Sequence, residues 1–410
     1  MLKASKKKEK NIISVMFVYW ISIIIWQTIR PVGNRSLIDT AMKIALFFPL
    51  LSYGWKHEKM TQNTVTFSYF LVFFITQMIT LITDSGEVGL SQLITIVFMM
   101  MEVVIFLIFL FRETCRLSMI EKFCSSLVIV AIVMSFYNMI FNFDTFIYTF
   151  SGGGGSYGHE CASFLYSNHE FALYLSVSIL SLFWSFFRKK TSVLKFAVIL
   201  TILALNLLST YSRTAILGLI IALSILIFFY DKKIFIYFLI IGIIALIVIL
   251  NNEFLYKLVF KQVLKGTFEN EGVLDEERAG MYVHEMNAFL NGTWFQKIFG
   301  QGYAGASKYG GHDAYLIVLL TGGVCMMAFF LFIIAFGFYH AYQVLRRDKL
   351  LGAFLIGFIV FALLYMFAQT PILFYSSMDS FFVTMIAVMI PFYTSNGIRW
   401  ETNFYEGTSN

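Results

Sequence analysis

Residues 234–251 read IFIYFLIIGIIALIVILN, a run that follows Lys232 and Lys233 and is apolar as far as the final Asn251. A helix needs about 20 mostly apolar residues to cross the roughly 30 Å hydrocarbon core of a bilayer. This run therefore predicts a transmembrane helix, and comparable runs recur along the chain. They lie near 11–29, 37–55, 64–82, 90–111, 124–142, 168–187, 194–210, 214–230, 312–338, 350–370 and 379–396.

The overall composition agrees with these runs. Of the 410 residues, 59% are hydrophobic and 13% are charged, and the mean hydropathy is +0.77. A soluble domain is about half apolar and about one quarter charged, so a soluble core would not bury this much apolar surface. The sequence predicts an all-α, polytopic integral membrane protein with about twelve transmembrane helices in one membrane domain, 1–410.

Basic residues predict the orientation, because cytoplasmic connections carry an excess of Lys and Arg. With the N-terminus in the cytoplasm, an even number of spans returns the C-terminus to the same side, and most basic residues outside the spans fall there. The net charge of +6 follows from this topology, so no nucleic-acid partner is needed. The cytoplasmic residues would be Lys3, Lys6, Lys7, Lys8, Lys10, Lys56, Lys59, Arg112, Arg116, Lys122, Arg188, Lys189, Lys190, Lys232, Lys233, Arg346, Arg347 and Lys349.

Two outward-facing connections are long. The connection at 143–167 contains GGGGS at 152–156, a flexible segment of native or introduced origin. The connection at 252–311 is a large extracytoplasmic loop, and loops of this length are usually functional. It predicts short amphipathic helices. One would carry Lys257, Lys261 and Lys265 on the lipid headgroups, and another, capped by Asp275, would run through 281–290.

Arg213, in TYSRTA at 210–215, is predicted at the outer start of a span. An arginine fork beside the free N–H groups of a helix N-terminus suits phosphate oxygens. The alternative is a snorkelling or topology-setting arginine, but basic residues are disfavoured on this side, which favours function. Arg278, in ERAG at 277–280, is a second candidate for a diphosphate clamp. An ion pair with a neighbouring acidic residue is an equal alternative for it.

His312, in GHDAYL at 311–316, opens the span near 312–338. A helix N-terminus disfavours the imidazolium, so a neutral histidine there can accept a proton. A structural histidine is the alternative. The glycine-rich GQGYAG at 300–305, with Gly310 and Gly311, favours a site, because it would let the backbone fold closely over a ligand.

SRTA at 212–215, Arg278, GQGY at 300–303 and HDAYL at 312–316, in this order, resemble the O-antigen polymerase and ligase family. YSNHEFALYL at 166–175 is similar to a family segment that opens an earlier span. The resemblance covers about 160–325. One departure is Asp313, because the family's histidine is often followed by Asn.

The resemblance implies a membrane-embedded glycosyltransferase of the GT-C type, metal-independent and without a cofactor, in the bacterial cytoplasmic membrane. Its donor and acceptor would be undecaprenyl-diphosphate-linked oligosaccharides on the outer face, and a flippase and a chain-length regulator are possible partners. It implies catalytic roles for His312, Arg213 and Arg278, and substrate-binding roles for Asp313, Tyr315, Tyr303, Asn168, Glu170 and Ser212.

The residues agree with metal independence. No D-x-D sequence occurs in an outer connection to hold a divalent ion on a diphosphate, and the His-Glu pairs at 159–160 and 169–170 match no zinc signature. The four cysteines fall on different sides or inside a span, and so predict neither a disulfide framework nor a zinc site. They are Cys115, Cys124, Cys161 and Cys325.

Three functions remain open at this point. A polymerase joins lipid-linked repeats, whereas a ligase moves the polymer to another acceptor. The Lys-, Ile- and Phe-rich composition suggests an AT-rich, Gram-positive source without lipopolysaccharide, which favours the polymerase. A lipid-linked oligosaccharide flippase or transporter is the third. Lys43 and Glu102, the charged residues inside spans, are isolated, and no related halves are evident, which disfavours transport.

Overall fold

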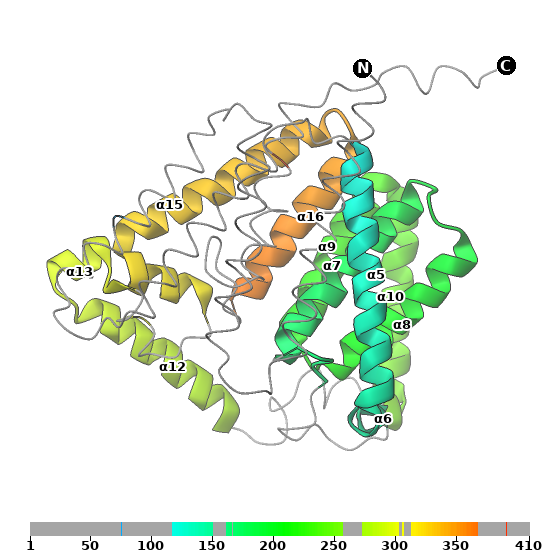
Figure 1. Cartoon of the computed structure of the whole chain (residues 1–410), viewed down its shortest axis with the longest axis horizontal. Coiled ribbons are helices and arrows are strands. Elements are labelled where there is room, and N and C mark those ends of the chain that lie inside the picture. Colours follow the sequence, from blue (N-terminus) through cyan, green and yellow to red (C-terminus); the bar gives the residue numbers. More distant parts are fainter. Residues whose placement is uncertain are drawn as a thin grey trace, which may run out of the picture.

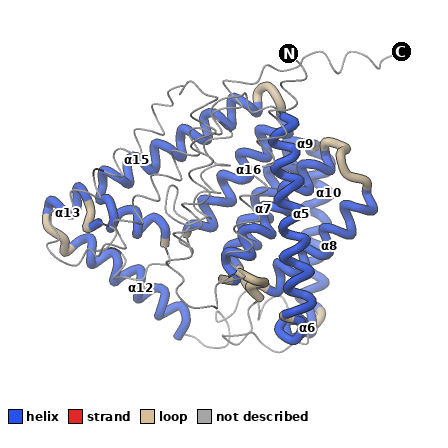
Figure 2. Tube along the Cα trace, in the orientation of Figure 1, coloured by secondary structure: helices blue, strands red, loops and turns tan. Residues whose placement is uncertain are grey.

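The computed structural model describes residues 75, 117–150, 161–165, 167–256, 273–302, 306, 313–367 and 391. These residues form helices, turns and connections, with no strand among them (Figure 1 and Figure 2). The predicted spans near 11–29, 37–55, 64–82, 90–111 and 379–396 fall outside the described residues, apart from Ile75 and Pro391. So do GGGGS and the predicted basic helix.

Six described helices are long and apolar enough to cross a membrane. They belong to α5 (Leu117–Phe141), α7 (Asn168–Phe187), α9 (Arg213–Tyr230), α10 (Lys232–Asn251), α15 (Ala314–Leu345) and α16 (Lys349–Met366). The apolar helix α8 (Val193–Ser209) is slightly shorter. Between them lie α6 (Phe143–Phe150), α11 (Glu253–Tyr256), α12 (Val273–Leu290) and α13 (Trp294–Phe299). The protein is therefore a helical, multi-pass membrane protein.

Local sequence explains where several helices begin. Ser167 accepts a hydrogen bond from the His169 N–H at the start of α7 (3.2 Å), and Asp231 accepts one from Lys233 at the start of α10 (2.7 Å). Thr293 and Gln296 form a reciprocal capping box at α13. The prediction that Asp275 caps a helix is wrong, because α12 begins at Val273 and Asp275 lies inside it.

The helix α16 lies at the centre of the packing, against α9, α15 and α7. It runs antiparallel to α9, and glycines bring the two backbones together. A Cβ built on Gly357 would lie 2.9 Å from the Ala222 carbonyl oxygen, and one on Gly218 would lie 3.0 Å from the Phe361 ring. Small residues at such crossings let membrane helices pack closely. By contrast, α10 has no buried residue and lies at the edge of the bundle.

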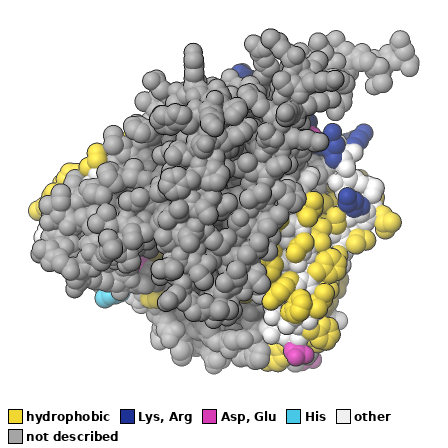
Figure 3. All heavy atoms as spheres, in the orientation of Figure 1, with side chains coloured by type: hydrophobic (Ala, Val, Ile, Leu, Met, Phe, Trp, Pro, Cys, Tyr) yellow, Lys and Arg dark blue, Asp and Glu magenta, His cyan; other side chains and the backbone are white. Residues whose placement is uncertain are grey.

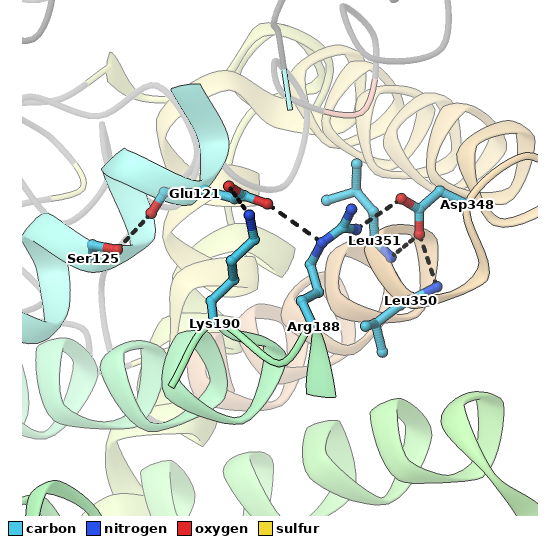
Figure 4. Close-up of polar contacts among 7 residues, drawn as sticks. All are labelled: Glu121, Ser125, Arg188, Lys190, Asp348, Leu350 and Leu351. Carbon is cyan, nitrogen blue, oxygen red and sulfur yellow. Dashed lines mark hydrogen bonds and ion pairs between the residues drawn. The ribbon is translucent and has the colours of Figure 1, made fainter. Parts of the chain in front are cut away.

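Basic residues gather at one end of this bundle, here called the basic end. Arg188, the C-cap of α7, donates to the Asp348 Oδ2 at the start of α16 (2.8 Å) and pairs with the Glu121 Oε1 on α5 (3.5 Å; Figure 4). Lys190 completes the cluster through the Glu121 Oε2. On the face in Figure 3, Lys and Arg side chains lie above a broad apolar region. This distribution is typical of a membrane protein with one cytoplasmic face.

The helix α15 is broken, although the sequence predicted one continuous span over 312–338. Gly323 has φ 65° and ψ −163°, outside helical values, so 314–322 and 324–345 are two helical pieces. The break meets the end of α13. A Cβ on Gly300 (φ 85°) would overlap the Thr321 backbone, and one on Gly323 would overlap the Ile298 backbone. The Gln301 N–H donates to the Leu320 carbonyl (2.7 Å). Gly300 thus allows the end of α13 to contact α15 closely. That GQGYAG folds over a ligand stays a prediction.

Replacing Gly300 with alanine is expected to separate α13 from the break in α15. The new Cβ would overlap backbone atoms, and its φ of 85° is unfavourable for a residue with a side chain. Such backbone strain costs about 1 to 3 kcal/mol, before any overlap is counted. Thermal unfolding of the detergent-solubilised protein measures the loss of stability in Gly300→Ala. Gly242→Ala on α10 is the control, because nothing lies within 4 Å of that Cβ. Equal stability of the two variants would contradict the packing role.

Candidate functional site

The last turn of α16 joins three other helices at the end of the bundle opposite the basic end. This end is here called the site end. The Tyr365 hydroxyl donates to the His169 carbonyl at the start of α7 (2.6 Å), and the Tyr315 hydroxyl of α15 donates to the Leu363 carbonyl (2.9 Å). The Tyr282 hydroxyl of α12 donates to the Phe367 carbonyl (3.2 Å). The starts of α7 and α15 and the middle of α12 are therefore attached to one helix end.

The start of α9 belongs to the same end. The Asn168 side-chain amide donates to the Thr210 carbonyl (2.9 Å), which ties the first residue of α7 to the turn before α9. This turn is sharp, because Tyr211 has a φ of 54°, a value uncommon for a residue with a side chain. It makes Arg213 the first, half-buried residue of α9. Positive helix N-termini and an arginine thus occupy the same end of the bundle.

Two other predicted residues lie in this region. Ser212 precedes α9, and its hydroxyl is buried and without a hydrogen bond to any residue within the described ranges. Glu170 lies in the first turn of α7. A buried hydroxyl without a protein partner is available to a ligand oxygen. Asn168, by contrast, is occupied with a structural hydrogen bond that holds two helix starts together.

Asp313 caps α15. Its Oδ1 accepts hydrogen bonds from the N–H groups of Tyr315 (2.7 Å) and Leu316 (3.3 Å). The carboxyl is buried, with 8% of the residue exposed. Burial raises the pKa of Asp313, while the two N–H donors act in the opposite direction by stabilising the carboxylate. Tyr315 packs edge-on against Phe330 and is fixed by its bond to α16, so it also has a clear structural role.

Glu285, on α12, was not singled out from the sequence. It is completely buried, and neither carboxyl oxygen has a hydrogen-bond partner among the described residues. Burial, together with the negative charge of Asp313, raises the pKa of Glu285 to about 7. No local pattern marks it, because it is one of several acidic residues on a helix of low hydropathy. Its burial depends on how α12 packs against α15.

The raised pKa of Glu285 predicts a pH-dependent stability. The folded protein binds the proton of Glu285 more tightly than the unfolded chain does. Below about pH 4.5 the carboxyl is protonated in both states, so it does not lower the free energy of unfolding. It destabilises the fold increasingly as the pH rises through about 7. Glu285→Gln is therefore expected to match the wild type at pH 4.5 and to be more stable at pH 8, by at most about 3 kcal/mol. Thermal unfolding at both pH values measures this.

The control for this prediction is Asp144→Asn on α6, where the side chain is exposed. We expect it to change stability little at either pH. A Glu285→Gln protein that is no more stable than the wild type at pH 8 would show that Glu285 is not held as a neutral acid.

The structure brings six of the nine predicted residues to the site end: Asn168, Glu170, Ser212, Arg213, Asp313 and Tyr315. Arg278 lies on α12 one turn before Tyr282, so its backbone approaches the same end, but its side chain is outside the described part. His312 and Tyr303 also lie outside it. Within the described ranges, no group of three or more His, Cys, Asp or Glu side chains gathers to hold a metal ion.

No protein-family model matches the chain, and no curated protein shows significant similarity to it. The chemistry of the site end is therefore inferred from its own residues. It combines an arginine, three helix N-termini and a buried hydroxyl, which suit an anionic oxygen ligand, with two buried carboxyl groups, which suit proton transfer.

Proposed function

We propose that the chain is a polysaccharide polymerase. It would join undecaprenyl-diphosphate-linked repeat units by glycosyl transfer on the outer face of the bacterial cytoplasmic membrane. The product would be a capsular, O-antigen or exopolysaccharide chain. This proposal takes its reaction from the resemblance of SRTA, Arg278, GQGY and HDAYL to the O-antigen polymerase and ligase family.

The observation that carries the proposal is the convergence at the site end. The starts of α7, α9 and α15 are connected through α16 and Thr210, and Arg213 stands at one of them. Helix N-termini and arginine are the groups that bind phosphate oxygens without a metal ion. The basic end lies opposite. If it faces the cytoplasm, as the bias of Lys and Arg favours, the site end faces the side on which lipid-linked sugars are polymerised.

In this proposal Arg213 and Arg278 bind the diphosphate of the donor and stabilise the charge that develops as it leaves. Ser212 and Glu170 would contact donor or acceptor oxygens. A hydroxyl on the terminal sugar of a second lipid-linked repeat attacks the anomeric carbon, and His312 orients it. The site uses no cofactor, and the proposed partners are the lipid-linked donor and acceptor, with a flippase and a chain-length regulator nearby.

A second candidate, from a different class, is a lipid-linked oligosaccharide flippase. The break at Gly323 favours it, because discontinuous helices line the substrate sites of many transporters. However, the break packs against the backbone of α13 through Gly300 and Ile298. An O-antigen-ligase-type transferase remains the alternative within the proposed family.

Deletion of the gene, followed by analysis of the lipid-linked sugars, tests the proposal. A polymerase predicts that single repeat units accumulate on the outer leaflet. Accumulation of long lipid-linked polymer would instead indicate a ligase, and units retained on the inner leaflet would indicate a flippase. Unchanged lipid-linked sugars would contradict all three functions.

A further inference from the structure

Two buried carboxyl groups from different elements lie close enough at the site end for the charge of one to act on the other. Asp313 belongs to the start of α15 and Glu285 to α12. Their surroundings differ sharply. Asp313 accepts two backbone hydrogen bonds, which favour its ionised form. Glu285 accepts none from the described residues, and it faces a neighbouring negative charge. An isolated buried carboxylate is very unfavourable, so Glu285 is the member that carries a proton.

No described cation compensates Glu285. Among the described elements, α12 packs mainly against α13, which carries Lys297, and α15, which begins next to Asp313 and carries Tyr315. Tyr282 of α12 also bonds to the end of α16. The Lys297 ammonium lies 5.7 Å from the centre of the Trp294 ring, and the Tyr315 hydroxyl is bonded to the Leu363 carbonyl. His284, next to Glu285 on α12, is exposed. Because Glu285 itself has no exposed surface, a proton fits this position better than a metal ion or a cationic ligand.

We propose that Glu285 and Asp313 form a two-carboxyl site that holds one proton, in which Asp313 is the base of the transferase reaction. This rests on the proposed function and deepens it. Asp313 retains some exposure and is the catalytic residue of the pair, whereas Glu285 is a positioning residue that is protonated below about pH 7. Because Glu285 is protonated, Asp313 has no second negative charge beside it and can remain ionised as the base.

The acceptor hydroxyl gives its proton to an Asp313 carboxylate oxygen as its own oxygen forms the new bond to the anomeric carbon. The bond from that carbon to the diphosphate oxygen breaks, and the electron pair leaves with the lipid diphosphate. Asp313 then returns its proton to water. A base in this role typically contributes about 100- to 10,000-fold to the rate.

Infrared difference spectroscopy of the full-length protein in lipid nanodiscs tests the proton site without any substrate. The wild type is expected to show the carbonyl stretch of a protonated carboxylic acid, which disappears as the pH rises through about 7. Glu285→Gln is expected to lack this band. In Asp313→Asn the neighbouring negative charge is absent, so the band is expected to disappear at a lower pH than in the wild type. An identical titrating band in Glu285→Gln would overturn the assignment.

Polymer formation in cells tests the catalytic role. Asp313→Asn is expected to lower polymer by at least about 100-fold, although asparagine still caps α15. Glu285→Gln removes the ionisable neighbour of the base, so it is expected to change the pH profile of polymer formation in isolated membranes above about pH 7, where the wild-type Glu285 ionises. Substantial polymer with Asp313→Asn, or an unchanged pH profile with Glu285→Gln in a protein that folds normally, would overturn the proposal. If gene deletion itself leaves the lipid-linked sugars unchanged, the proposed function fails instead.

Discussion

Replacing Arg213 with alanine is expected to lower the amount of lipid-linked polymer by about 100- to 1,000-fold, the usual cost of removing one charge-stabilising group. Arg213 begins α9 at the site end, where its charge adds to that of the helix N-terminus. Without it, the charge that develops on the leaving diphosphate is poorly stabilised. Labelled lipid-linked sugars, extracted from cells with equal amounts of membrane-inserted protein, measure the loss.

Two controls sharpen the Arg213 experiment. Arg213→Lys keeps the charge but not the planar fork, so we expect an intermediate loss if the contact is bidentate. Arg346→Ala removes an exposed charge at the basic end and is expected to leave polymer formation unchanged. If Arg213→Ala leaves both the chain length and the amount of polymer unchanged, Arg213 has no part in catalysis.

Replacing Arg188 with alanine is expected to destabilise the fold by about 3 kcal/mol. Loss of one partner from a buried ion pair costs about 3 to 5 kcal/mol, and the Arg188 and Asp348 side chains are each only 15% exposed. The substitution leaves Asp348 and Glu121 without their shared cation and removes the guanidinium from the Trp184 ring, 5.4 Å from its centroid. Thermal unfolding followed by tryptophan fluorescence measures the change.

The matched control for Arg188 is Lys190→Ala. Lys190 also pairs with Glu121, but its side chain is 60% exposed, so we expect a loss below about 1 kcal/mol. Adding Asp348→Asn to Arg188→Ala is expected to recover part of the stability, because it removes an unpaired charge while asparagine still caps α16. Equal losses in Arg188→Ala and Lys190→Ala would show that the cluster does not hold the helices together.

Within the described part of the chain, the positions of the apolar helices follow closely from hydropathy. The span predicted at 168–187 matches α7 at both ends, and the one at 214–230 begins one residue after Arg213, where α9 starts. Long apolar runs have this property because the bilayer fixes the helix length. The break in α15 was missed for the same reason. Gly322 and Gly323 lie inside an apolar run, and the contact with Gly300 that accompanies the break is distant in sequence.

The site was predicted only in part. Arg213 and Asp313 stand out because each begins a helix beside a recognisable motif, and the structure connects their two helices through α16. Glu285 could not be identified as a site residue from the sequence. It stands out by its burial and by its nearness to Asp313, and both depend on how α12 packs against α15. Arg188 and Asp348 are similar in this respect. They lie 160 positions apart, and only the packed bundle brings them together.

The helices α7 and α10 have the same length but different surroundings: most residues of α7 are buried, and none of α10 is. Lipid accepts isoleucine, leucine, valine or phenylalanine almost equally, whereas a packed position requires one shape. In a collection of natural variants, α10 would therefore exchange one apolar residue for another freely while keeping its hydropathy. Over the same evolutionary time, α7 would change little. Such a contrast in substitution rate would record which helix faces the membrane and which faces the protein.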